Sequence, residues 1–252
     1  MQHLTPMSGD SERQALLRDK MIKKGAKGEK SRYVSKISSV LKPNMTLLDI
    51  GCGTGHIIQT LAHHHKNIFF VGLDISPGML KKAKENTVNI PNISLVRGNG
   101  LLLPFSECSF DIVITRLAEY SPKEAYRTVK KGGCFFEYGL GPEADKEIVE
   151  FFRDRIEEEN FFFPHDISKW KEEVCVNIKN VGFVVSTIEE YKEKDAFQNV
   201  DELMDTIEMV PLVKNFDREK DRGVVAELAK KYRDDHGIKT TWHYYILEAR
   251  RS

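Results

Sequence analysis

The stretch LLDIGCGTGH, residues 47–56, decides the fold because it joins an apolar strand pattern to a glycine-rich turn. We predict a buried strand over residues 46–50 and a helix from about Gly55 to His65. A glycine-rich turn between a first strand and a first helix brings the backbone close to a ligand at the helix N-terminus. The question is which kind of ligand this turn holds.

The spacing of the glycines argues against two common phosphate-binding turns. A Walker phosphate loop requires the pattern G-x-x-x-x-G-K-[ST], but Gly55 is followed by His56. The dinucleotide pattern G-x-G-x-x-G, counted from Gly51, requires its third glycine at position 56, which is again the histidine. The sequence therefore excludes a nucleoside triphosphate and disfavours a dinucleotide.

Two acidic residues indicate what the turn binds instead. Asp49 lies two residues before the first glycine, where its carboxylate would repel a pyrophosphate and attract a cationic amine. Asp74 ends the next predicted strand, and a carboxylate there can accept hydrogen bonds from two vicinal ribose hydroxyls. We therefore predict a nucleoside with a positively charged amino-acid tail and no phosphate.

Strand and helix patterns alternate along the rest of the chain. Further strands are predicted over residues 68–74, 93–98, 110–116, 132–140, 182–191 and 240–250. Helices are predicted to begin near Pro77 and to fill residues 143–160, 167–180 and two stretches within 196–237. This alternation predicts an α/β protein with a doubly wound, seven-stranded, mostly parallel sheet.

Four segments together resemble the class I S-adenosylmethionine-dependent methyltransferases. The similarity is greatest to the small-molecule group near the ubiquinone- and menaquinone-biosynthesis type. The segments are LLDIGCGTGH (47–56), VGLDIS (71–76) with Met79, GNGLLLPFSECSFDIV (98–113) and VKKGGCFFEY (129–138). The resemblance extends over about residues 30–140, and over 141–252 only in the order of strands. It implies a Rossmann-like fold, a methyltransferase activity and S-adenosyl-L-methionine as cofactor.

The resemblance also implies which residues bind the cofactor: Asp49, Gly51, Cys52, Gly53, Asp74, Ile75, Met79, Gly98, Asn99, Gly100 and Arg116. The glycine turn would line the methionine part with Asp49 near its amino group, and Asp74 would hold the ribose. Ile75 and Met79 would pack on the adenine. Asn99 stands where the family usually has an aspartate, and its carbonyl oxygen can still accept from the adenine amino group. Arg116 would lie near the sulfonium.

The methyl acceptor is less directly encoded. The sequence TRLAEYSP (115–122) lacks the Asn/Asp-Pro-Pro-aromatic motif of enzymes that methylate exocyclic amines and glutamine amides. Equal numbers of basic and acidic residues, 38 each, disfavour a nucleic-acid substrate. We expect a small-molecule acceptor in a pocket that segments 143–165 and 196–238 cap, with an aromatic wall formed by Phe151, Phe152, Phe161, Phe162 and Phe163.

Two other functions stay open at this point. The dense basic residues between positions 18 and 36 could serve an RNA or protein methyltransferase, and a module that binds the cofactor without turnover would share the same motifs. A base is needed only where the acceptor must lose a proton early. Tyr120 and His165 are our candidates for it, and Glu137, Tyr138 and His243 are further ones.

The overall organisation is predicted as N-terminal helices over residues 1–41 and a methyltransferase domain over 42–252. No apolar run approaches the roughly 20 residues of a membrane span, and the N-terminal residues are polar and mixed in charge. The four cysteines are scattered without C-x-x-C spacing, so they predict reduced thiols and no metal centre. A cytoplasmic location is expected on these grounds.

Overall fold

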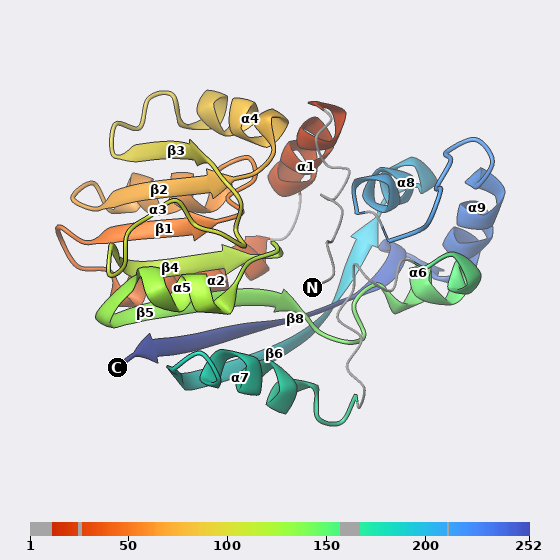
Figure 1. The fold of residues 1–252 in the computed structure, drawn as a ribbon. Coiled ribbons are helices and arrows are strands. Elements are labelled where there is room, and N and C mark those ends of the chain that lie inside the picture. Colours follow the sequence, from red (N-terminus) through yellow and green to blue (C-terminus); the bar gives the residue numbers. More distant parts are fainter. Residues whose placement is uncertain (1–11, 25–26, 157–166, 211) are drawn as a thin grey trace. The chain divides into compact units, whose positions relative to one another are not determined.

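The computed structural model describes residues 12–24, 27–156, 167–210 and 212–252 (Figure 1). Its described chain divides into two compact units. Of the described residues, the larger unit comprises 12–24, 27–139, 171–189 and 246–252, and the smaller one comprises 140–156, 167–170, 190–210 and 212–245.

The predicted elements follow one another in the predicted order, and helix α5 and strand β7 are additional to them. The strands are β1 (Thr46–Ile50), β2 (Phe69–Asp74), β3 (Ile93–Arg97), β4 (Phe110–Arg116), β5 (Val129–Leu140), β6 (Phe183–Phe197), β7 (Arg233–Asp234) and β8 (Gly237–Arg251). The helices are α1 (Glu12–Lys24), α2 (Lys27–Val40), α3 (His56–His64), α4 (Pro77–Thr87), α5 (Pro122–Thr128), α6 (Lys146–Phe151), α7 (Trp170–Lys179), α8 (Val200–Met209) and α9 (Arg222–Lys231), with a 3-10 turn at Arg153–Arg155.

The sheet has the strand order β3-β2-β1-β4-β5-β8-β6. Strand β1 pairs in parallel with β2 and β4, β2 with β3, and β4 with β5. The doubly wound α/β prediction is therefore confirmed. The one strand beyond the predicted seven is the two-residue β7, which pairs antiparallel with β8. The order reverses between β1 and β4, and in open α/β sheets ligands bind beyond the carboxyl ends of the strands at such a point.

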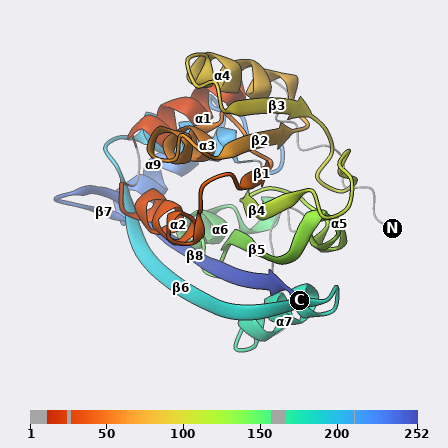
Figure 2. The same cartoon turned by 90° about the vertical axis from the view of Figure 1, so that its left-hand side faces the viewer.

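Helices cover both faces of the sheet in the larger unit, with α2 and α3 on one face and α5 on the other (Figure 2). Helix α2 is fixed by Tyr33, whose hydroxyl donates to the carbonyls of Thr115 (2.9 Å) and Phe136 (3.2 Å) at the ends of β4 and β5. The second N-terminal helix thus supports the end of the sheet at which a ligand is expected.

The smaller unit has a hydrophobic core of its own. Helix α8 is amphipathic, and its buried side chains Leu203, Met204 and Ile207 pack with residues of α6, α9 and β8. Phe152 is buried in this core with Phe216 nearby, and Phe151 contacts Tyr232. These two phenylalanines therefore pack within the unit instead of forming an exposed aromatic wall, which corrects the sequence interpretation. Phe161, Phe162 and Phe163 lie outside the described residues.

The predicted helix over residues 143–160 is shorter in the structure. Up to residue 156 it consists of α6 followed by the 3-10 turn at Arg153–Arg155, and residues 157–160 lie outside the described residues. Arg155 donates to both oxygens of Asp221 (2.6 and 3.0 Å) and to the carbonyl of Lys214, so tertiary contacts hold it there. The assignment of 143–165 and 196–238 as cap insertions stays a prediction.

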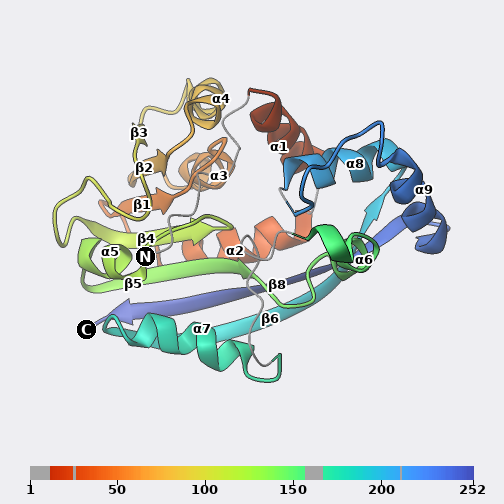
Figure 3. The same ribbon diagram turned by 45° about the vertical axis from the view of Figure 1, so that its right-hand side comes forward.

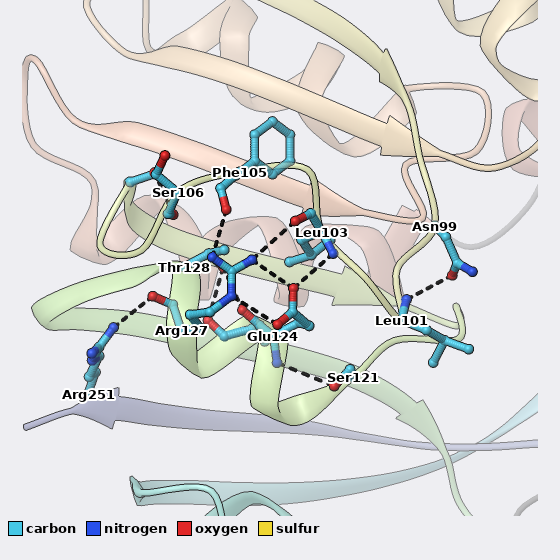
Figure 4. Close-up of polar contacts among 12 residues, drawn as sticks. Asn99, Leu101, Leu103, Phe105, Ser106, Ser121, Glu124, Arg127, Thr128 and Arg251 are labelled. Atoms are coloured by element: carbon cyan, nitrogen blue, oxygen red, sulfur yellow. Dashed lines mark hydrogen bonds and ion pairs between the residues drawn. The ribbon is translucent and has the colours of Figure 1, made fainter. Parts of the chain in front are cut away.

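Arg251 anchors the last strand of the larger unit to helix α5 (Figure 4). Its Nη1 donates to the carbonyls of Tyr126 (2.9 Å), Arg127 (2.9 Å) and Val129 (2.7 Å), which lie at the end of α5 and the start of β5. The guanidinium also lies 4.6 Å from the centre of the Tyr126 ring. One charged group thus satisfies main-chain acceptors that the helix end leaves open.

We expect Arg251→Ala to lower the free energy of unfolding by about 2 kcal/mol, because hydrogen bonds to a charged donor are lost. The matched control is Arg250→Ala, which removes an exposed guanidinium whose nearest acid, Glu248, is 3.7 Å away. That variant should change stability by less than about 0.5 kcal/mol. Urea unfolding of both variants measures this, and equal losses would contradict the anchoring role.

Candidate functional site

The glycine turn is held together by its own amides. The N–H groups of Gly51 and Cys52 both donate to the carbonyl of Leu73 (2.8 and 2.9 Å), and Gly55 N–H donates to the Cys52 carbonyl. Gly51, Gly53 and Gly55 all have positive φ, which glycine adopts at low cost. These three amides donate within the chain, so they are not available to a phosphate group.

Asp74 ties the turn to the neighbouring helix. Its Oδ2 accepts from the N–H of Gly53 (2.7 Å), and its Oδ1 accepts from the N–H of Ser76 (2.9 Å), which is the N-cap of α4. Each carboxylate oxygen has a second lone pair for a ligand hydroxyl. Burial raises the pKa of Asp74, and its backbone hydrogen bonds work against that rise.

Asp49 is the second carboxyl group beside the turn. It is the fourth residue of β1, with only 2% of its surface exposed. Burial, together with the charge of Asp74, raises the pKa of Asp49 to about 8, while Arg116 opposes the rise. A buried acid of this kind carries a proton at neutral pH and ionises when a cation lies beside it.

The residues predicted around an adenine have two different environments. Ile75 follows β2 and is 50% exposed, and Leu101 and Leu102 follow β3 and are 45% and 75% exposed. Met79, in contrast, is buried at the start of α4. The exposed apolar side chains come from the ends of two paired strands, β2 and β3. Their arrangement provides an apolar surface at the strand ends.

The segment after β3 is attached to α5 (Figure 4). Arg127 donates to the carbonyls of Phe105 (2.7 Å) and Leu103 (3.1 Å), while Glu124 accepts from the N–H of Leu103 (2.9 Å). In the same segment, Oδ1 of Asn99 accepts from the N–H of Leu101 (2.9 Å). The sequence predicts that the same oxygen accepts from the adenine amino group. In the structure it already accepts from one main-chain N–H.

Gly98 and Gly100 are required by close packing. A Cβ on Gly98 would lie 2.9 Å from Leu73, and one on Gly100 would lie 2.5 Å from the Glu119 carbonyl oxygen. Gly100 also accepts from the N–H of Ser121 (3.1 Å) through its carbonyl. These contacts bring the segments that follow β3 and β4 together at one end of the sheet.

The ends of β4 and β5 carry the polar groups nearest to an expected acceptor. Arg116 lies with its guanidinium 4.8 Å from the centre of the Tyr138 ring. The hydroxyl of Tyr120 donates to Oε2 of Glu137 (2.8 Å), and the Tyr120 ring packs on Phe135. Tyr120 and Glu137, which the sequence proposes separately, therefore form one hydrogen-bonded pair.

A family model described as a methyltransferase domain matches residues 47–133. The matched range contains the glycine turn, Asp49, Asp74 and the anchored segment after β3. Over residues 47–133 the chain is therefore similar to a methyltransferase domain. S-adenosyl-L-methionine is the cofactor that this similarity implies.

Two curated proteins that are similar to this chain are named as methyltransferases. The chain is 35% identical over 118 residues to a demethylmenaquinone methyltransferase of Desulfitobacterium hafniense, covering 42% of this chain and 46% of that protein. It is 26% identical over 144 residues to malonyl-[acyl-carrier protein] O-methyltransferase 1 of Coxiella burnetii, covering 54% and 48%. The chain thus spans about half the length of these relatives.

Solved structures share the fold of the methyltransferase domain. A candidate methyltransferase from Bacillus halodurans C-125 superposes with a TM-score of 0.63 at 20% identity, covering 89% of this chain and 99% of that one. A geranyl diphosphate methyltransferase, solved with geranyl diphosphate and sinefungin, has a TM-score of 0.56 at 14% identity, covering 89% and 78%. At these identities the likeness concerns the fold alone.

The structure describes the surroundings of two other candidate bases, Tyr138 and His243. Tyr138 is buried between Arg116 and Tyr33. His243 is completely buried, its Nδ1 accepts from the N–H of Glu143 (3.1 Å), and its Nε2 lies 2.9 Å from Glu190. Both side chains are therefore enclosed by protein in the ligand-free structure. His165 lies outside the described residues and stays a prediction.

Two residues of α1 were missed by sequence reasoning. Arg18 and Asp19 were counted only as part of a charged helix, yet Asp19 is buried against His56, and Arg18 interacts electrostatically with Asp74 and Arg116. Lys36, another basic residue, pairs with Glu189 (2.5 Å). The basic surface is therefore smaller than the residue count indicates. Only three-dimensional contacts distinguish these charges from exposed ones.

Two further features of the described residues concern metal binding and membrane crossing. Within the described ranges, no group of three or more His, Cys, Asp or Glu side chains is arranged for a metal ion. None of the described helices is long and apolar enough to cross a membrane.

The raised pKa of Asp49 predicts how stability depends on pH. A carboxyl whose pKa is about 8 when folded and about 4 when unfolded binds its proton more tightly in the folded state. The free energy of unfolding of the ligand-free protein therefore falls as pH rises from 5 to 8, by up to about 1.4 kcal/mol per pH unit from this group. Urea unfolding at several pH values should show a shallower fall in Asp49→Asn.

The matched control for this prediction is Asp154→Asn, the same chemical change at an exposed carboxylate in the 3-10 turn. Its pH dependence should follow that of the unsubstituted protein. An unchanged slope in Asp49→Asn would show that Asp49 does not hold a proton at neutral pH.

Proposed function

We propose that this chain transfers the methyl group of S-adenosyl-L-methionine to a small-molecule acceptor. The observation that carries the proposal is the pair of buried acids, Asp49 and Asp74, on either side of a glycine turn in which four glycine and cysteine amides donate within the chain. Such a site favours an uncharged ribose and a cationic amine over a phosphate. The methyltransferase domain at residues 47–133 supports the same ligand.

The residues present fit this cofactor. A Cβ added to Gly53 would meet no atom within 4 Å, so the turn has open space on that side. Asp49 offers a buried carboxyl to the ammonium group, and Asp74 keeps lone pairs for the ribose. Ile75, Leu101 and Leu102 offer exposed apolar surface of the kind that an adenine covers.

The chemistry places limited demands on the protein. When bound, the cofactor supplies a methyl group on a positively charged sulfur, which a nucleophile displaces directly. The protein's part is to align the acceptor, to exclude water and, where needed, to accept a proton. We propose that Tyr120 and Glu137 together accept the proton from the acceptor. The Tyr120 hydroxyl donates to Oε2 of Glu137, so the phenol can give its proton to the carboxylate while its oxygen takes one from the acceptor.

The names of the relatives support a small acceptor. Two of them are named for demethylmenaquinone and for malonyl groups on a carrier protein, and a neighbour by fold was solved with geranyl diphosphate. We propose an acceptor of comparable size, bound beyond the ends of β4 and β5, with the segments 143–165 and 196–238 as its cap. Because two of the N-terminal cations, Arg18 and Lys36, already face acids of the chain, an RNA substrate is less well supported.

The proposal is tested with S-adenosylmethionine labelled on its methyl group and a lysate of the protein's own source. The product is separated by size and treated with nuclease and protease. We expect label in the small-molecule fraction, and none with Asp74→Ala, which should also lose binding of S-adenosylhomocysteine. Glu107→Ala, which removes an exposed carboxylate, is the control and should behave like the unsubstituted protein.

Each other outcome of that experiment contradicts part of the proposal. Label retained with RNA or protein would identify a macromolecular acceptor. Absence of transfer, with S-adenosylhomocysteine still bound in calorimetry, would favour a module that binds the cofactor without turnover.

The Tyr120–Glu137 pair predicts a second result once an acceptor is identified. Glu137→Gln should lower kcat by about 100-fold, the usual contribution of a general base, and Tyr120→Phe should also lower it. Affinity for S-adenosylhomocysteine should stay within about twofold for both. The fall of activity at low pH should disappear in Glu137→Gln. An unchanged kcat would show that the acceptor loses its proton without this pair.

A further inference from the structure

Helix α1 is fastened to the glycine turn by one buried acid. Asp19 is 5% exposed, and its Oδ1 lies 2.8 Å from Nε2 of His56, the residue that follows the turn. The same oxygen accepts from Nδ2 of Asn86 (3.0 Å), which also donates to the carbonyl of Thr54 within the turn (2.9 Å). Figures 1 and 3 show α1 beyond the carboxyl ends of β1 and β2, next to α4.

This attachment fixes the side chain next to it. Arg18 precedes Asp19, and its Nε is buried with no hydrogen-bond acceptor in the part of the chain that the structure describes. Burial lowers the pKa of Arg18, the Asp74 carboxylate raises it, and the Arg116 guanidinium lowers it. The guanidinium of Arg18, whose Nε atom is buried, therefore interacts electrostatically with both Asp74 and Arg116.

Two guanidinium groups that repel one another in a buried place are stabilised by an anion. Asp74 is one anion nearby, but it is already bound to Gly53 and Ser76. The amides of Gly51, Cys52, Gly53 and Gly55 are also used within the chain. These four amides are therefore not available to a further negative group, whereas the Nε–H of Arg18 is a buried donor with no acceptor among the described residues.

The cofactor of the proposed function has such a group. Its amino-acid tail is a zwitterion, and Asp49 complements only the ammonium half. We propose that Arg18 binds the carboxylate of the cofactor's amino-acid tail, with Asp19 as the positioning residue that fixes α1 on the glycine turn. This inference rests on the proposed function. It makes the first N-terminal helix a part of the cofactor site.

The test compares two ligands that differ only in the tail. S-adenosylhomocysteine has the amino-acid group, whereas 5′-methylthioadenosine has the same adenine and ribose without it. Calorimetric binding of both is measured with the unsubstituted protein, Arg18→Ala, Arg18→Lys and Lys20→Ala. Lys20 is an exposed cation on the same helix and serves as the matched control.

We expect Arg18→Ala to bind S-adenosylhomocysteine about 10- to 100-fold more weakly, the usual effect of losing a charged hydrogen bond. Its affinity for 5′-methylthioadenosine should stay within about twofold, which also shows that the variant is folded. Arg18→Lys should lose less, because it keeps the charge without the planar fork. Lys20→Ala should bind both ligands normally.

Other results overturn the inference. An equal loss for both ligands would place Arg18 at the ribose or in the fold, and no loss for either would show that Arg18 does not contact the tail. If the unsubstituted protein binds neither ligand, the proposed function itself fails. Selective failure of the Arg18 prediction leaves that function intact.

Discussion

The carboxylate of Asp74 is the contact on which the site depends. It ends β2, accepts from Gly53 in the turn after β1, and accepts from the N-cap residue of α4. A single side chain thereby fixes the glycine turn, the strand end and the start of a helix relative to one another. Because it is buried, each of these hydrogen bonds is stronger than it would be in water.

This arrangement explains the choice of ligand. In phosphate-binding turns the amides point toward the ligand, whereas here Leu73 and Asp74 accept four hydrogen bonds from Gly51, Cys52, Gly53 and Ser76. With these four amides used, Leu73 and Asp74 present acceptors, and Asp49 becomes a further one when a cation beside it ionises its carboxyl. A ligand with hydroxyls and an ammonium group fits acceptors, and a phosphate does not.

Residues outside the glycine turn hold the neighbouring segments of the site in place. Arg127 and Glu124 hold the segment after β3 through main-chain contacts, and Tyr33 reaches the ends of β4 and β5 from α2. None of these residues lies in the four segments that resemble the methyltransferases. They keep flexible turns in one conformation, and preorganisation of this kind reduces the entropy that binding costs.

Short-range patterns in the sequence determined the strands, the helix starts and the chemistry of the ligand, because each depends on residues a few positions apart. The glycine spacing at 51–55 and the acids at 49 and 74 are examples. Only the tertiary structure decided what the charged N-terminal helix does, since Asp19 meets His56 and Asn86 across 37 and 67 residues. It likewise joined Tyr120 to Glu137 and enclosed Tyr138 and His243. Periodicity shows which face of an element is apolar, but it does not show which distant side chain that face meets.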